Sequence, residues 1–181
     1  MKEESTEPEA KDLNITEIKA EIESVNEMKK KVWQTLDRVY IDLVGPTTPS
    51  ADHFTGAMIT WDKGSNFVNL ATIKDKMPET ILKHWRSFYP GKAGDEPPTH
   101  PKSVYCDNGG EFRGEFEKYI EETAKATFRR SLPYRPQTNA VQERLHKTIE
   151  QGVKASMSIS GAPLKFWSFA LRCWVYNFNR T

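Results

Sequence analysis

Three acidic residues are placed where carboxylates could do chemistry. Asp42 interrupts the apolar run DRVYIDLVG, Asp107 ends the run KSVYCD, and Glu143 lies in the segment NAVQERLHKTIE. Two-metal phosphoryl transfer needs carboxylates that hold two divalent ions about 4 Å apart, and oxygen ligands suit Mg²⁺ or Mn²⁺. An acid inside a strand, an acid at the end of a neighbouring strand and an acid on a helix would supply such a cage. We therefore expect these three residues to be metal ligands and catalytic residues.

Each of the three also has a plainer explanation. The chain contains 25 Asp and Glu residues, and some of them must fall at strand ends or on solvated helix faces. Asp107, directly before the turn sequence NGG, is a good turn former. Only the joint placement of the three acids favours a metal site.

The elements that must position these acids can be predicted from local patterns. Alternating β-branched and aromatic residues predict strands in DRVYIDLVG, FTGAMITWD, NFVNLATIK and KSVYCD, and a short extended run in TFRR. The spacer KGS between the second and third runs predicts a hairpin. Pro133 and Pro136 predict a loop after TFRR that is held open.

Helices are predicted from apolar periodicity and capping residues, in PETILKHWRSFYP, EFEKYIEETA and PLKFWSFALRCWVYNFN, the last starting at Pro163. A further long helix should run from Ala140 to about Met157, with Asn139 as its N-cap, which places Glu143 on its first full turn. The order of elements indicates an α/β fold with a mixed five-stranded sheet flanked by helices. RNase H-like topology fits this order.

The acidic residues and the segments around them resemble a known family. Thirty-five residues separate Asp107 from Glu143, which is the D,D-35-E spacing of the catalytic core of retroviral and LTR-retrotransposon integrases. The segments IDLVGP, YCDNGGEF and SLPYRPQTNAVQERLHKTIE look like the three signature blocks of that family, in order. The closing segment PLKFWSFALRCWVYNFNRT resembles the end of the core in copia-like elements. The resemblance covers Val32 to Thr181.

The resemblance implies an enzyme, a polynucleotidyl transferase and endonuclease that performs DNA 3′-end processing and strand transfer with two Mg²⁺ or Mn²⁺ ions. It also implies that Lys147 and Gln137 contact DNA. Helical spacing independently places Lys147 one turn after Glu143, although a Glu–Lys surface pair would explain it as well. Tyr134 is expected to stack on, or bond to, a DNA end.

Two weaker predictions complete the expected site. Arg144 is a further candidate for DNA binding, and Asn108, which follows the second acid, is expected to orient it.

Charge and composition divide the chain at residue 31. Residues 1–31 contain six Lys against nine acids, a net charge of −3, and we expect an acidic tail that is partly helical or disordered and has a possible protein partner. Residues 126–181 contain nine Lys and Arg against two Glu, a net charge of +7. Residues 32–181 should form the core, which is expected to bind DNA and to form a homodimer or higher oligomer.

Cysteine usage and hydropathy exclude several classes of protein. Cys106 and Cys173 are far apart, so neither a disulfide framework nor a zinc site is indicated. No apolar run approaches the roughly 20 residues that span a bilayer. We expect no membrane partner and an intracellular location, in the nucleus if the resemblance holds.

Some features depart from the family and keep a second interpretation open. Ala140 stands where family members usually have Gly. The zinc-binding and basic β-barrel domains of full-length integrases have no counterpart in this sequence, so we expect either an excised core or a natural protein that kept the core and lost its neighbours. The alternative is a domesticated integrase-like domain without catalysis that serves as a protein-assembly or scaffold module. Another RNase H-like nuclease is disfavoured by the D-35-E spacing.

Overall fold

The computed structural model describes residues 32–45, 47–131 and 136–181, with the side chains of residues 136–142 excepted. The predicted acidic tail, residues 1–31, lies outside the described residues, as do Pro133 and Tyr134. The division of the chain at residue 31 therefore stays a prediction.

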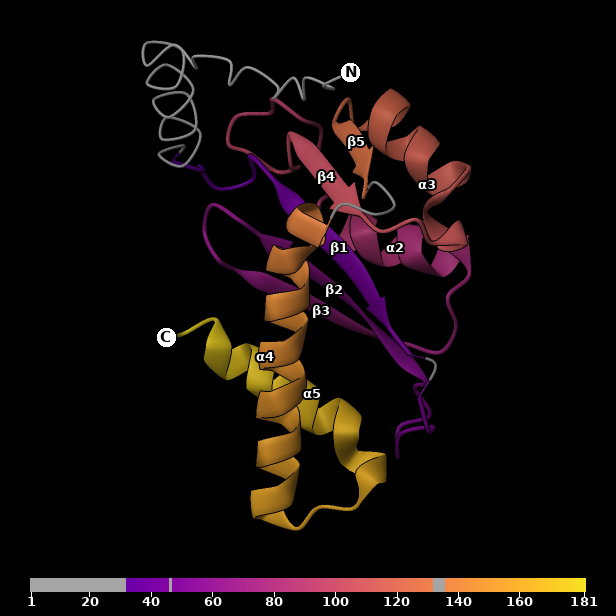
Figure 1. The fold of residues 1–181 in the computed structure, drawn as a ribbon. Helices are drawn as coiled ribbons and strands as arrows, with labels where there is room; N and C mark the ends of the chain where they lie inside the picture. Colours follow the sequence, from indigo (N-terminus) through magenta and orange to yellow (C-terminus); the bar gives the residue numbers. More distant parts are fainter. Residues whose placement is uncertain (1–31, 46, 132–135) are drawn as a thin grey trace, which may run out of the picture. The chain divides into compact units, whose positions relative to one another are not determined.

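A five-stranded mixed sheet forms the centre of the described part (Figure 1). The strand order is β3-β2-β1-β4-β5; β1 pairs with β2 and β2 with β3 antiparallel, whereas β1–β4 and β4–β5 are parallel. The strands are β1 (Val39–Val44), β2 (Gly56–Asp62), β3 (Val68–Ile73), β4 (Ser103–Cys106) and β5 (Thr127–Arg130). The predicted α/β class and the predicted hairpin are confirmed, and the order is consistent with an RNase H-like core.

Helices cover both faces of the sheet because side chains alternate along each strand. Val39, Ile41 and Cys106 point into one core, which contains α2 (Pro78–Phe88) and α3 (Glu115–Lys118). α3 is preceded by the turn η1 (Gly110–Phe112) and continues into the π-helical turn η2 (Tyr119–Thr123).

The opposite face of the sheet packs against α4 (Pro136–Ser160) and α5 (Trp167–Phe178), with η3 (Leu164–Phe166) leading into α5. Figure 1 shows α4 crossing in front of the sheet and α5 behind α4. Ala57 and Ile59 of β2 are buried on this side with Ile149 of α4. Asp42 lies between Ile41 and Leu43 and therefore points toward this second layer.

The N-terminus of α4 differs from the prediction. The helix begins at Pro136 and ends at Ser160, rather than running from Ala140 to about Met157. Proline lacks an N–H group and has a helical φ, so it is well suited to the first helical position, and Asn139 becomes an interior residue instead of the N-cap. Glu143 consequently lies about two turns into the helix. Gly161, with φ of 64°, follows the helix in the left-handed conformation typical of a helix end.

The last predicted helix also begins later than expected. Pro163 precedes the 3₁₀ turn η3, and the α-helix starts at Trp167. Trp167, Leu171 and Val175 are buried, four residues apart along one face. No helix of the described segments is long and apolar enough to cross a membrane.

Candidate active site

Asp42 lies on the central strand and points at α4. Its Oδ1 accepts a hydrogen bond from the Leu43 N–H at 2.6 Å, and its Oδ2 lies 3.2 Å from Nε2 of His146 on α4. Burial raises the pKa of Asp42, and the charge of Asp107 raises it further, whereas His146 and the Leu43 N–H act in the opposite direction. Asp42 is therefore a partly buried carboxyl whose pKa is raised overall, although His146 and the Leu43 N–H favour its ionised form.

Asp107 lies beside Asp42. The parallel β1–β4 register ends with Tyr40 opposite Tyr105, and its continuation by two residues would place Asp42 and Asp107 on the same face. The charge of Asp107 contributes to the raised pKa of Asp42, which supports this placement. Asp107 is exposed, and its Oδ1 accepts the Gly109 N–H at 2.9 Å. The structure thus places Asp107 close enough to Asp42 for its charge to act on that carboxyl.

The pKa of the buried Cys106 thiol is also affected by these two acids. Burial raises the pKa of the Cys106 thiol to about 12, and the charges of Asp107 and Asp42 contribute to the increase. A thiol with such a pKa remains protonated at neutral pH and is a poor nucleophile. Cys106 is therefore not a candidate nucleophile.

Glu143 is exposed on α4, three residues before His146. Helical neighbours at this spacing have Cβ atoms about 5–6 Å apart, so Glu143 occupies the same side of α4 as the residue that contacts Asp42. Among the described residues, no three His, Cys, Asp or Glu side chains are close enough to hold a metal ion together. Asp42 contacts His146 of α4 and is affected by the charge of Asp107, and Glu143 lies about one turn from His146. The full triad stays a prediction.

The predicted DNA-binding residues lie along the same helix where they are described. Lys147 and Arg144 are exposed, and within the described part of the chain Lys147 forms no ion pair, which differs from the Glu–Lys surface pair considered for it. Gln137 belongs to the first turn of α4 rather than to a loop, and its side chain is not described. Tyr134 lies outside the described residues.

Asn108 contacts the chain beyond β5. Its side-chain amide donates a hydrogen bond to the Ser131 carbonyl at 2.8 Å. This bond joins the segment after β4, which contains Asp107, to the end of β5. An orienting role for Asn108 stays a prediction, and any such role would act through the backbone.

His146 contacts Asp42 but was not among the site residues predicted from the sequence. Its position three residues after Glu143 was the available signal, because helical spacing places both on one face. His146 also lines an apolar cavity of about 400 Å³ between the sheet, α4 and α5, together with Ile149, Val153 and Trp167. His146 therefore contacts Asp42 on one side and borders this cavity on the other.

Comparisons with known proteins identify similar sequences among transposon proteins. No protein-family model matches the chain. The chain is similar to the retrovirus-related Pol polyproteins from transposon TNT 1-94 of Nicotiana tabacum (28% identical over 148 residues, 81% of this chain and 11% of the relative) and from transposons RE2 and RE1 of Arabidopsis thaliana (26% and 25% identical, 80% of this chain and 10% of each relative). The chain spans about a tenth of the length of these curated relatives. The predicted resemblance to retrotransposon proteins is confirmed.

Proposed function

We propose that this chain is an integrase catalytic core that performs metal-dependent 3′-end processing and strand transfer on DNA in the nucleus. The observation that supports it most is the proximity of Asp42, within β1, to Asp107, directly after the parallel strand β4, where the charge of Asp107 contributes to the raised pKa of Asp42. The similarity to Pol polyproteins of transposons is consistent with this class of chemistry.

The acidic pair fits a divalent cation by its donor chemistry. Burial and, to a smaller extent, the neighbouring charge of Asp107 raise the pKa of Asp42. A cation would offset both effects, and Mg²⁺ or Mn²⁺ takes oxygen ligands of this kind. When bound, the ions activate the attacking oxygen and stabilise the leaving oxygen of a phosphodiester. Asp42 and Asp107 would hold them, and Glu143 would complete the ligand set from α4.

The remaining residues would bind and orient DNA. Lys147 and Arg144 lie on the first half of α4, close to Glu143, and their exposed cationic groups can pair with phosphates. Gln137, in the first turn of this helix, and Tyr134, which precedes the helix in the sequence, would contact the DNA end. His146 would fix Asp42 relative to α4 through its Nε2.

Substitution of Asp107 tests this proposal. We expect Asp107→Asn to abolish joining of a labelled oligonucleotide 3′ end to target DNA, and to lower Mn²⁺ affinity in calorimetry, because a neutral amide is a poor ligand for a hard cation. Glu122→Gln, on the exposed surface of η2, is the matched control and should leave both unchanged. Unchanged activity or Mn²⁺ affinity in Asp107→Asn would show that the assignment is wrong.

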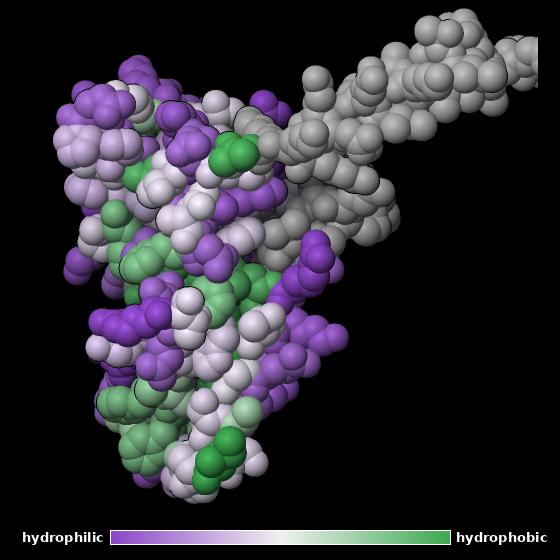
Figure 2. All heavy atoms as spheres, turned by 90° about the vertical axis from the view of Figure 1, so that its left-hand side faces the viewer, coloured by the Kyte–Doolittle hydropathy of each residue, from purple (hydrophilic) through white to green (hydrophobic). Residues whose placement is uncertain are grey.

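Exposed apolar side chains favour a second candidate, a non-catalytic assembly module. Leu164, Phe166, Phe169 and Tyr176 of η3 and α5 are 38–66% exposed. Figure 2 shows hydrophobic residues at the surface of the lower part of its view, where α4 and α5 lie. A chain that self-associates but has no affinity for Mn²⁺ at millimolar concentration would favour this candidate over the catalytic one.

A further inference from the structure

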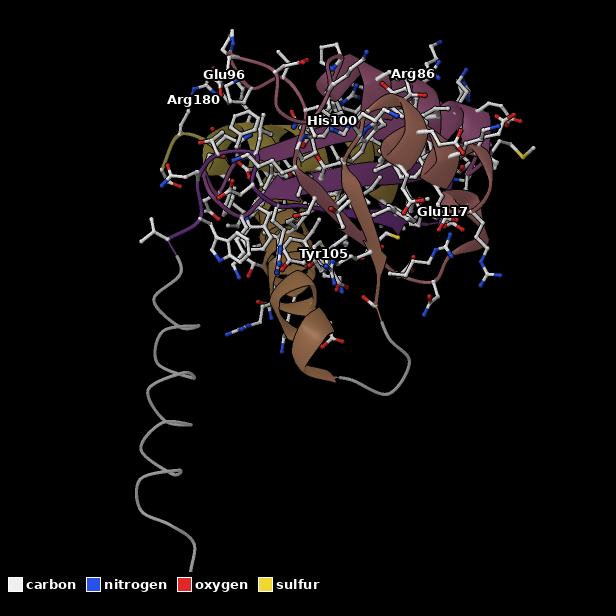
Figure 3. The ribbon with its side chains drawn as sticks, turned by 90° about the horizontal axis from the view of Figure 1, so that it is seen from above. Arg86, Glu96, His100, Tyr105, Glu117 and Arg180 are labelled. Carbon is white, nitrogen blue, oxygen red and sulfur yellow. The ribbon has the colours of Figure 1, made fainter. Side chains whose placement is uncertain are left out.

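A stacked layer of aromatic and cationic side chains adjoins the acidic pair on the same face of the sheet. Tyr40 stacks on Trp61 with ring centroids 5.4 Å apart and contacts Tyr105 at 5.5 Å. The Arg38 guanidinium extends this layer, because its Cζ lies 4.1 Å from the ring centroids of both Tyr105 and Trp33. Figure 3 shows Tyr105 on the side of the sheet where α4 lies.

Two cations in this layer, Arg38 and Lys63, have no carboxylate partner among the described residues. Lys63 Nζ lies 5.0 Å from the ring centroid of Trp33, over which Arg38 also stacks. Within residues 32–45, 47–131 and 136–181, neither cation forms a salt bridge with a carboxylate. The Arg38 Nε is buried without a hydrogen-bond acceptor, and burial together with the charge of Arg38 lowers the pKa of Lys63. An anion placed here would relieve the repulsion between the two cations and stabilise both.

The layer is aligned with the proposed catalytic site. Arg38, Tyr40 and Asp42 alternate along the extended chain and so share one face. At a rise of about 3.3 Å per residue, Arg38, directly before β1, lies on the order of 13 Å from Asp42 along the extended chain. This length is about four steps of B-DNA, in which phosphates of one strand recur every 3.4 Å along the axis.

We propose that Arg38 and Lys63 form a phosphate-binding subsite for the DNA strand whose reacting phosphodiester lies at Asp42 and Asp107. The inference rests on the proposed function and extends it to a second contact point on the substrate. A phosphodiester oxygen would accept hydrogen bonds from the guanidinium and the ammonium group. The edges of Trp33 and Tyr105 would border the sugar or base of that nucleotide.

DNA binding at varied salt tests the subsite without requiring catalysis. Affinity for a fluorescent DNA duplex is measured by anisotropy from 50 to 200 mM salt for the wild-type chain, Lys63→Gln and Arg38→Gln. Each variant should bind more weakly and lower the slope of log affinity against log salt by about 1, the loss of one phosphate contact. Lys118→Gln removes a cation that is 72% exposed on α3, on the opposite face, and should keep the wild-type slope.

Further variants distinguish the loss of a phosphate contact from altered packing and from an error in the proposed catalytic function. Arg38→Lys keeps the charge without the planar stack and should retain the wild-type slope, so a fall in affinity with an unchanged slope in Arg38→Gln would indicate altered packing and overturn the role of Arg38. The subsite is overturned if Lys63→Gln behaves like Lys118→Gln, or if the wild-type chain binds no duplex at 50 mM salt. Mn²⁺ affinity that depends on Asp107 would uphold the catalytic function in either case.

Discussion

At the scale of single residues, the contact between Asp42 and His146 influences the protonation of Asp42. Asp42 is partly buried next to a second carboxylate, and both circumstances favour its protonated form. His146 opposes them from 3.2 Å away. Because a carboxylate must lose its proton to bind a metal ion, the availability of the pair for Mg²⁺ or Mn²⁺ depends on this balance.

Replacement of His146 should shift the pH dependence of metal binding. In His146→Gln the pKa of Asp42 should rise further, because a group that lowers it is lost. Mn²⁺ affinity, which is present above the pKa of Asp42 and falls as pH drops through it, should then decline at a higher pH than in the wild-type chain. Calorimetric titrations over a pH series measure the midpoint. His84→Gln, on α2 beneath the other face, is the control, and a common midpoint for all three proteins would refute the assigned role.

At the scale of elements, the close packing of α4 on α5 fixes the helix that presents Glu143 and His146. Gly152 of α4 is the point of closest approach, because a Cβ built there would lie 1.7 Å from Nε1 of Trp174. The Trp174 ring in turn stacks on Phe178 with centroids 5.0 Å apart. Absence of a side chain at residue 152 thus allows the indole to lie against the α4 backbone.

Gly152→Ala should therefore destabilise the fold, although alanine is the better helix former. Helix propensity alone would stabilise the variant by about 0.5–1 kcal/mol. Overpacking typically costs about 1–3 kcal/mol, and a stacked indole cannot move aside freely, so we expect a net loss. Urea unfolding measures the difference. Ser156→Ala, an exposed position one turn later on the same helix, should be neutral or slightly stabilising, and equal stability gains in both variants would contradict the packing argument.

At the scale of the whole molecule, polar contacts join segments that are far apart in the sequence. Asp52, in the loop between β1 and β2, accepts hydrogen bonds from Ser50 and Ser168 and pairs with Arg172 of α5. Near the C-terminus, the Asn179 side chain bonds both the N–H and the carbonyl of Val68 at 2.8 Å. These two groups of contacts hold α5 against the sheet at both of its ends.

The Asp52 contacts should give the protein a characteristic acid sensitivity. Burial alone would raise the pKa of Asp52, but hydrogen bonds from Ser168, Ser50 and Arg172 outweigh it and lower the pKa from 3.8 to about 2. A lowered carboxyl pKa stabilises the fold above the unfolded value and loses that effect as pH falls from about 4 to about 2. Asp52→Asn should be less stable than the wild-type chain at pH 7 and lose less stability over this range. Urea unfolding at several pH values checks this, and parallel stability curves for the two proteins would count against it.

The sequence by itself determined the order and type of the elements and the three candidate acids. Strands such as DRVYIDLVG and helices such as PETILKHWRSF were predictable because their apolar periodicity is a local property of the chain. The first residue of α4 was not predictable, because Pro136 suits the first helical position and Asn139 suits the N-cap. Local sequence patterns do not decide between these two starts.

Only the tertiary structure decided which side chains meet. The pairing of β1 with β4 placed Asp107 next to Asp42, the packing of α4 on the sheet brought His146 to Asp42, and the stacking of Arg38 on Tyr105 joined the layer beside them. Each of these contacts links residues more than 60 apart in the chain, beyond the reach of helical or strand periodicity. Their geometry depends on how two cores pack on opposite faces of one sheet, which is a property of the assembled fold.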